Sequence, residues 1–246
     1  MPITAAELIA YGSASRPTDD TSTTGGAIDT ADRPEFTQWT ANAVAAVVSD
    51  GADTRTVTVE GRLATGAIDS EVLTLNGTTE VVGAKTFERV LTITLSATSG
   101  TRTVTVRQGS GGATRATIGI NETSRTALFR RSASSTSGIT IRYEKIFWKN
   151  TNGSLTLNSA AVKLTADPDS RIRIGLDTAI NATVSVANRV SAPGSVTFVD
   201  DNVSQSVPGG VLAAGDRIGV WIEQNLPQSD SAHKTTFTTE LSGTTT

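Results

Sequence analysis

Short stretches in which apolar and polar residues alternate dominate the chain after residue 41. TRTVTVEG (54–61) is a clear example, because it places Val57 and Val59 on one face and threonines on the other. A period of two residues is typical of β-strands that bury one face, and Thr and Val both favour strands. The pattern therefore predicts strand after strand and no long helix in this part of the chain.

Two copies of one hexamer, TRTVTV, occur at residues 54–59 and 101–106. The residues that follow the two copies do not match, so we interpret them as strands of one sheet rather than as repeated modules. Between them, Asn76-Gly77 ends another alternating stretch and is a strong signal for a tight hairpin turn. We predict a small antiparallel sandwich over 41–108, in which the two copies are the first and last full strands.

A second series of alternating stretches follows GSGGAT (109–114), which we interpret as a linker. YEKIFWKN (143–150) has bulky residues at both odd and even positions, which predicts a central strand covered on both faces. LAAGDRIGVWIEQ (212–224) predicts a Gly-Asp turn that leads into a strand with Ile218 and its alternate neighbours inward. These stretches predict a second, larger sandwich over 114–246, similar to a jelly roll.

Residues 1–40 follow a different pattern. Thr4 and Glu7 have the spacing of a capping box, which predicts a short helix over residues 5–10. The stretch that follows, SASRPTDDTSTTGGAIDTADRP, is rich in Ser, Thr, Asp, Gly and Pro. Such a composition favours an extended arm that becomes ordered by contact with other proteins.

The sequence as a whole therefore predicts an all-β protein with two antiparallel β-sandwich domains, Ig-like or jelly-roll-like, and an extended N-terminal arm. We expect the arm to anchor the protein to its neighbours, because a segment that orders on binding can wrap a large surface. The predicted partner-binding residues of the arm are Ile3, Leu8, Tyr11, Ile28, Phe36 and Trp39.

Composition and charge narrow the range of functions. The chain has 246 residues, no cysteine and a formal net charge of −3. The lack of cysteine excludes disulfide frameworks and thiolate chemistry, and nucleic-acid binding would need a basic excess. No stretch reaches the roughly 20 apolar residues of a membrane-spanning helix. The first residues, MPITAAELIAYG, do not have the pattern of a signal peptide. We expect a protein made in a cytoplasm that binds neither nucleic acid nor membrane.

The sequence holds little that points to catalysis. His233 is the single histidine and lies in a polar stretch, and the chain has neither a nucleophile-elbow motif nor a P-loop. We expect no enzyme, no cofactor and no metal, and we interpret the acidic pairs as turn residues, with a structural cation at a subunit interface as the alternative. The acidic pairs are Asp19-Asp20, Asp167 with Asp169, and Asp200-Asp201.

Two kinds of interaction surface are alternatives to the arm. Arg130-Arg131 either docks a carboxylate of a partner or lies solvated at the end of a strand. A carbohydrate- or receptor-binding module would need exposed aromatic residues, for which Trp39, Trp148 and Trp221 are the candidates.

Six stretches spread over nearly the whole chain carry a family resemblance: ITAAELIAYGSAS, PTDDTSTTGGAIDT, SEVLTLNGTTEVVGAKTFERVLTITLSA, YEKIFWKNTNGSLTLNSAAVKLTADP, LAAGDRIGVWIEQNLP and TTFTTELSGTTT. Through them the chain resembles a group of structural proteins from the virions of tailed bacteriophages. The resemblance implies a capsid decoration, cement or turret protein on the outside of the head, with a neck or tail component as the alternative. It implies the major capsid protein or other virion proteins as partners and no catalytic residues. A cyclic homo-oligomer would suit the symmetry of such a particle.

Overall fold

The computed structural model describes residues 2–98, 100–230 and 236–245. Nearly all of its regular structure is β, as the alternating pattern predicts. Helical structure within these ranges is limited to two short 3-10 turns, Ala5–Glu7 and Pro208–Gly210. None of the described helices has the length and apolar character needed to cross a bilayer.

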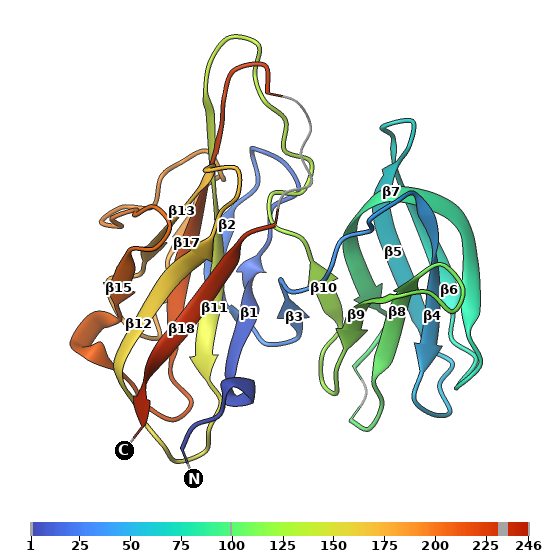
Figure 1. Cartoon of the computed structure of the whole chain (residues 1–246), viewed down its shortest axis with the longest axis horizontal. Helices are drawn as coiled ribbons and strands as arrows, with labels where there is room; N and C mark the ends of the chain where they lie inside the picture. The colour runs from blue at the N-terminus through green and yellow to red at the C-terminus, as the bar shows by residue number, and fades with distance from the viewer. Residues whose placement is uncertain (1, 99, 231–235, 246) are drawn as a thin grey trace. The chain divides into compact units, whose positions relative to one another are not determined.

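The chain forms two compact units, coloured by residue number in Figure 1. We call residues 30–127 the central unit. We call residues 1–29 together with 128–246 the terminal unit, because it contains both ends of the chain. These boundaries differ from the predicted division into 1–40, 41–108 and 114–246, since the first part of the chain belongs with the last.

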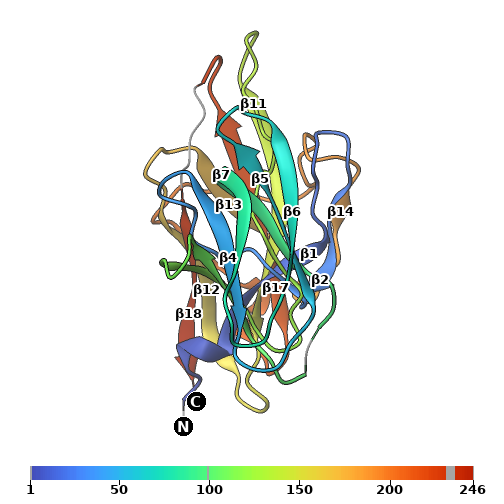
Figure 2. The same ribbon diagram turned by 90° about the vertical axis from the view of Figure 1, so that its right-hand side faces the viewer.

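A single eight-stranded sheet builds the central unit, and Figure 2 shows several of its strands from one side. The pairing order is β3-β10-β7-β4-β8-β9, and β5 pairs with both β6 and β7. The long β7 pairs with β4 through its first half and with β5 and β10 through its second half. The sheet therefore curls around its core. The strands are β3 (Asp32–Arg33), β4 (Ala43–Ser49), β5 (Thr56–Leu63), β6 (Ile68–Thr74), β7 (Val81–Leu95), β8 (Val104–Gln108), β9 (Thr114–Ile118) and β10 (Ser124–Thr126).

The alternation in the sequence is confirmed in the core of the central unit. Val57 and Val59 of β5 and Val104 and Val106 of β8, which come from the two TRTVTV copies, are all fully buried. The prediction that the second copy is the last strand is wrong, because β9 and β10 follow it in the same sheet.

The predicted linker GSGGAT is the turn of the β8–β9 hairpin. Its two ends are joined by a hydrogen bond of 3.1 Å from the Gln108 N–H to the Ala113 carbonyl. Gly109 and Gly111 have φ angles of 78° and 61°, which glycine adopts at little cost in a tight turn. The glycines therefore serve hairpin geometry, and the linker prediction is wrong.

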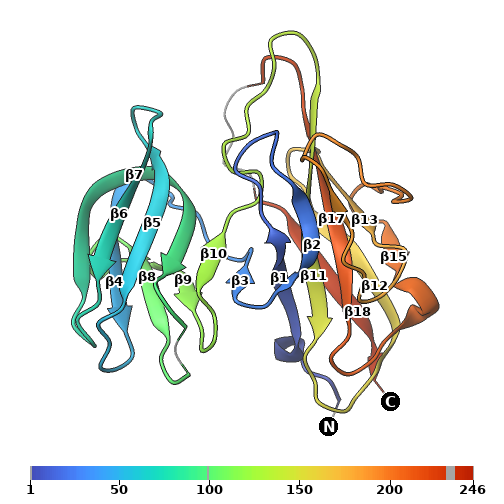
Figure 3. The same ribbon diagram turned by 180° about the vertical axis from the view of Figure 1, so that it is seen from behind.

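The terminal unit consists of two sheets that pack on each other (Figure 3). Its core combines residues such as Ile174, Val220 and Ile218 from one sheet with Val162 and Leu241 from the other. The six-stranded sheet has the order β13-β17-β11-β1-β2-β14. In the four-stranded sheet, β12 pairs with β15 and β16 on one side and with β18 on the other. The strands are β1 (Leu8–Ser15), β2 (Thr24–Asp29), β11 (Thr140–Asn150), β12 (Leu157–Ala166), β13 (Ile172–Leu176), β14 (Ser185–Val186), β15 (Ser204–Ser206), β16 (Val211–Leu212), β17 (Arg217–Leu226) and β18 (Thr238–Thr245).

The strand predicted to be covered on both faces is β11. It lies between β17 and β1, and its residues from Arg142 to Phe147 are buried on both parities. Ile218 at the start of β17 is also buried, as predicted.

The N-terminal arm is the main correction to the sequence analysis. Residues 8–15 form β1, which pairs with β11 on one side and with β2 on the other (Figure 3). The helix predicted over residues 5–10 is only the 3-10 turn Ala5–Glu7, in which the Thr4 N–H donates to Glu7 Oε2 over 2.8 Å. From Leu8 onward the backbone pairs with β11 instead, and a short helix cannot compete with that ladder.

Candidate functional site

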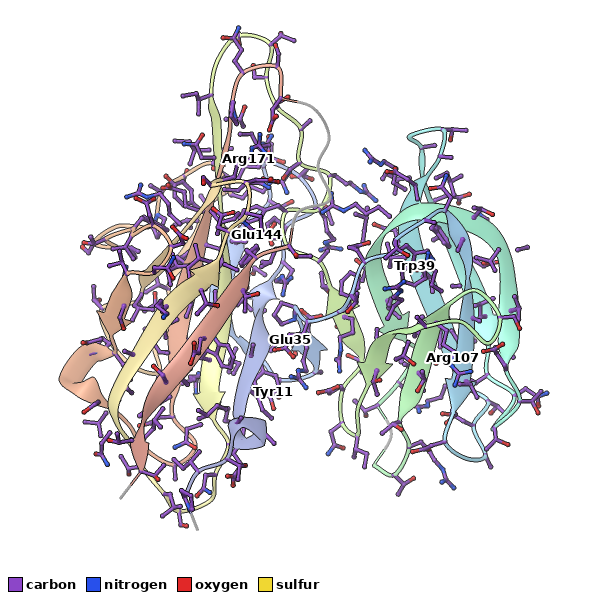
Figure 4. The ribbon with its side chains drawn as sticks, in the orientation of Figure 1. Tyr11, Glu35, Trp39, Arg107, Glu144 and Arg171 are labelled. Carbon is purple, nitrogen blue, oxygen red and sulfur yellow. The ribbon has the colours of Figure 1, made fainter. Side chains whose placement is uncertain are left out.

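The six predicted partner-binding residues do not form one site. Ile3 and Leu8 pack against the core of the terminal unit, and Phe36 packs against the core of the central unit. Trp39 is only 1% exposed and belongs to the same central core (Figure 4).

Tyr11 of β1 and Ile28 of β2 are the remaining two of the six. Both are partly exposed and share one face of the six-stranded sheet, since Ser13 pairs directly with Ile28. The set as a whole is therefore divided between two cores and one sheet face, and it does not describe an anchoring arm.

The turn after β1 carries a carboxylate that binds two arginines. Arg142 Nε and Nη2 donate to Asp20 Oδ1 and Oδ2 over 2.7 and 2.9 Å, which is the two-pronged geometry that guanidinium groups favour. Arg189 Nε donates to Asp20 Oδ1 over 2.7 Å. These contacts, led by the hydrogen bond from Arg142, lower the pKa of Asp20 to about 2.

A second carboxylate, Glu144, lies on the same face of β11 as Arg142 and is 1% exposed (Figure 4). Its Oε1 accepts the Phe129 N–H over 2.8 Å, and Arg16 Nε and Arg189 Nη1 each lie 3.8 Å from its oxygens. Burial raises the pKa of Glu144, and the neighbouring arginines oppose that effect.

Arg130 joins these groups through the backbone. Its Nη2 donates to the Arg16 carbonyl over 2.9 Å, and Arg189 Nη1 donates to the Arg130 carbonyl over 2.8 Å. Arg130 thus turns toward its own chain, whereas the sequence analysis expected it to meet a partner or solvent; Arg131 beside it is exposed. We call the following six side chains the arginine cluster: Arg16, Asp20, Arg130, Arg142, Glu144 and Arg189.

The arginine cluster ties together segments that are far apart in the sequence. The turn after β1, the residues before β11, β11 itself and the segment around Arg189 all contribute to it. The oxygens of Asp20 and Glu144 face donors of the protein itself, so the arrangement holds segments in place rather than activating a substrate. Buried carboxylates paired in this way are costly to disrupt.

Sequence reasoning missed this cluster, although one signal was present. Arg142 and Glu144 occupy alternate positions in a strand that is covered on both faces, and charged residues in a covered strand need partners. Asp20 was interpreted only as a turn residue. Its partners, Arg142 and Arg189, are 122 and 169 residues away in the sequence.

The other acidic residues form hydrogen bonds and ion pairs of their own. Asp167 Oδ2 accepts the Ile172 N–H over 2.7 Å in the turn before β13, as expected of a turn residue. Asp200 lies 3.2 Å from Arg173, and Asp201 accepts from Asn202. Over the described ranges, no group of three or more His, Cys, Asp or Glu residues could hold a metal ion. His233 lies outside the described residues.

The tryptophans do not form an exposed aromatic surface. Trp39 and Trp221 are 1% and 0% exposed. Trp148 packs against the core of the terminal unit, and its Nε1–H donates to Thr239 Oγ1 over 3.2 Å. This arrangement does not support a carbohydrate platform built from these three residues.

The last strand of the terminal unit is an edge strand. In the part of the chain that the structure describes, β18 pairs only with β12, from Leu157 to Ala166. Thr238, Glu240, Ser242 and Thr244 are exposed on its outer face. Lys and Pro, which often protect sheet edges against pairing, are both absent from TTELSGTT.

No family model, no curated protein and no solved structure matches this chain.

Proposed function

We propose that this chain is a structural component of a bacteriophage virion and that it acts as a decoration, cement or turret protein on the outside of the head shell. The resemblance of six stretches to virion structural proteins supports this proposal. The structural observation that carries it is the outer edge of β18, with which no other strand pairs among the described residues. The proposed role is assembly and stabilisation of a particle, without a chemical reaction.

An exposed edge strand offers a row of backbone N–H and C=O groups to a neighbouring protein. Adding a strand to such an edge is a common way in which proteins join. Thr238, Ser242 and Thr244 flank these groups with small polar side chains, and Glu240 is the only charged residue of the strand. The edge is therefore suited to pairing with a strand of the major capsid protein or of another virion protein.

The position of the N-terminal segment changes how attachment is proposed to work. Residues 8–15 lie inside the six-stranded sheet, and Asp20 is held by the arginine cluster. The segment is thus part of the folded body, so we propose attachment through a folded surface instead of an arm. A cyclic homo-oligomer is the arrangement that fits a symmetric shell, and a neck or tail position is the alternative location.

Binding to shells tests this proposal. Purified full-length protein is mixed with expanded capsids that lack it, and the bound fraction is measured by co-sedimentation. We expect saturable binding. A S242K/T244K variant should bind about tenfold more weakly or less, because two added lysines oppose strand pairing at this edge.

A T114K/T117K variant is the matched control, since Thr114 and Thr117 are exposed on β9, an edge strand of the central unit. It adds the same charge and should bind like the unmodified protein. Failure of the full-length protein to bind would contradict a place on the head shell. Equal binding by all three proteins would leave the head assignment intact and rule out β18 as the attachment edge.

A further inference from the structure

A buried lysine and a buried aspartate meet on the face of β11 opposite to Glu144. Lys145 and Asp177 are 0% and 1% exposed, and Lys145 Nζ lies 2.6 Å from Asp177 Oδ2. Lys145 comes from β11, and Asp177 directly follows β13. β17 lies between these two strands, and its Trp221 pairs with Lys145 on one side and with Gly175 on the other.

The surroundings of this pair are largely apolar and aromatic. Lys145 Nζ lies 4.6 Å from the centre of the Phe147 ring and 5.4 Å from that of Trp221. It donates to the Val184 carbonyl over 3.1 Å. Asp177 Oδ1 accepts the Trp221 Nε1–H over 2.9 Å. These contacts hold the amine and the carboxyl group beside each other in a site closed to solvent.

The approach of the two groups is close, but it does not have the directions of a hydrogen bond. Asp177 Oδ2 has no hydrogen-bond partner of normal geometry among the described residues, although Lys145 Nζ is 2.6 Å away. The attraction within a fully buried ion pair repays the cost of its desolvation only where the geometry is good and hydrogen bonds satisfy the remaining polar atoms. The pair therefore has the contact distance of a salt bridge without its usual alignment.

Gly219 of β17 leaves the space in which the pair fits. A Cβ at this position would lie 2.1 Å from Asp177 Oδ2 and 2.4 Å from Lys145 Cε, both far inside van der Waals contact. The Asp177 N–H donates to the Gly219 carbonyl over 2.9 Å, which fixes the backbone beside the carboxyl group. Any other residue at 219 would push the two side chains apart.

Burial also favours the neutral form of Lys145. Desolvation lowers the pKa of Lys145, and the attraction of Asp177 opposes it. Transfer of one proton from the ammonium to the carboxylate leaves a free amine beside a carboxylic acid. A buried amine of this kind is a nucleophile, whereas an ammonium is not.

We propose that Lys145 Nζ and Asp177 Cγ become joined by an amide bond inside the terminal unit. The lone pair of the amine attacks Cγ, the Nζ–Cγ bond forms and the Cγ–Oδ2 bond breaks. Oδ2 leaves as water, with the proton of the carboxylic acid and one proton of the amine. No oxidant or other reactant is needed. The Trp221 N–H on Oδ1 positions the carbonyl that remains.

Such a bond would close a covalent ring through β11, β12 and β13. A cross-link between distant residues restricts the unfolded chain and so stabilises the folded one. It would act on strands of both sheets of the terminal unit, since β12 belongs to the four-stranded sheet. The proposal is independent of where the protein sits on a particle.

Mass spectrometry of the purified full-length protein under denaturing conditions tests the proposal. We expect a mass lower by one water molecule than that of the K145R variant, after correction for the substitution. Tryptic digestion should yield a branched peptide in which Tyr143–Lys149 is joined to Ile174–Arg189, without cleavage after Lys145. A protein mass equal to the mass calculated from the sequence would overturn the proposal. A linear peptide in which Asp177 has lost water without being joined to Lys145 would overturn it as well.

Two further variants give distinct masses. D177N should lose ammonia instead of water, because the amide nitrogen becomes the leaving group. G219A keeps both reacting groups but moves them apart, so it should have the full sequence mass. Where a variant fails to fold, the mass of the unmodified protein still decides the question.

Discussion

The carboxylate of Asp20 holds three segments of the terminal unit in contact. It accepts from Arg142 on β11 and from Arg189, and it lies in the turn after β1. Its side chain is 42% exposed, whereas those of Arg142 and Arg189 are 6% and 1% exposed. Loss of the carboxylate would therefore leave two buried cations without this partner, and that is a larger penalty than loss of an ordinary surface pair.

The sign of the pH dependence follows from the pKa of Asp20. The pKa is lowered from 3.8 to about 2 on folding, so the carboxylate stabilises the folded state above pH 3.8. That stability is lost as the pH falls through about 2. Burial raises the pKa of Glu144, so protonation of that group acts in the opposite direction. Glu144 is present both in D20N and in the unmodified protein, so its contribution cancels when the stabilities of the two proteins are compared at the same pH.

We expect D20N to lower the free energy of unfolding by about 1 kcal/mol at neutral pH, a value reduced for the partial exposure of the carboxylate. The difference from the unmodified protein should shrink as the pH falls from 3.8 to about 2. Urea unfolding at a series of pH values measures it. D201N changes the same charge in an exposed segment and should leave stability at neutral pH unchanged. A difference that stays constant down to the lowest pH would contradict this account.

Strand β6 is joined to the first half of β7 by side chains instead of a β-ladder. Glu71 Oε1 accepts the Ala84 N–H over 2.6 Å and the Lys85 N–H over 3.4 Å. Gly83 makes this approach possible, because a Cβ there would lie 2.2 Å from Glu71 Oε2. An ion pair adds to this connection, since Lys85 Nζ of β7 lies 2.6 Å from Asp69 Oδ1 of β6.

Replacement of Glu71 tests this connection. E71A should lower the free energy of unfolding by about 1 kcal/mol, since it removes the charged acceptor of two backbone N–H groups. Hydrogen exchange measured by NMR should become faster at the amides of Ala84 and Lys85. S70A, at an exposed neighbouring position, should change neither quantity. Unchanged exchange at the two amides in E71A would show that the carboxylate does not hold the strands.

The terminal unit is discontinuous in the sequence, and this has consequences for the whole molecule. Residues 1–29 supply β1 and β2, which lie between β11 and β14 in the six-stranded sheet. Residues 30–127 are inserted between these strands and the remainder of the unit and have a core of their own. The two units therefore differ in their dependence on the N-terminal residues.

A truncated chain that begins at residue 30 should lose the fold of the terminal unit. Without β1, the backbone of β11 would be unpaired along one edge, next to the face that the sheet normally buries. We expect aggregation or loss of the near-UV circular dichroism of Trp221. The fragment 30–127 should remain folded and give a dispersed NMR spectrum, since its core residues all lie within it. A truncated chain that unfolds with the same midpoint as the full protein would show that β1 and β2 are dispensable.

The sequence by itself determined the class of structure and the inward faces of its strands. Alternation is a local property, and burial of one face of a strand selects apolar residues at every second position. For this reason Val57, Val59 and Ile218 were placed correctly, and the mixed parity of β11 identified a strand covered on both faces. The tight turn at Asn76-Gly77 was likewise readable from two adjacent residues, and Gly77 has a φ of 57°.

Only the tertiary structure decided which strands share a sheet. A polar, glycine-rich stretch has the same local composition whether it is an arm or a strand with its turn, so residues 1–40 were misassigned. Their place is decided by pairing with β11, which is more than a hundred residues away in the sequence. The partners of Asp20 and the contact between Lys145 and Asp177 depend on the same long-range pairing. Local patterns carry no information on such contacts, because the register between distant strands is set by the packing of the complete core.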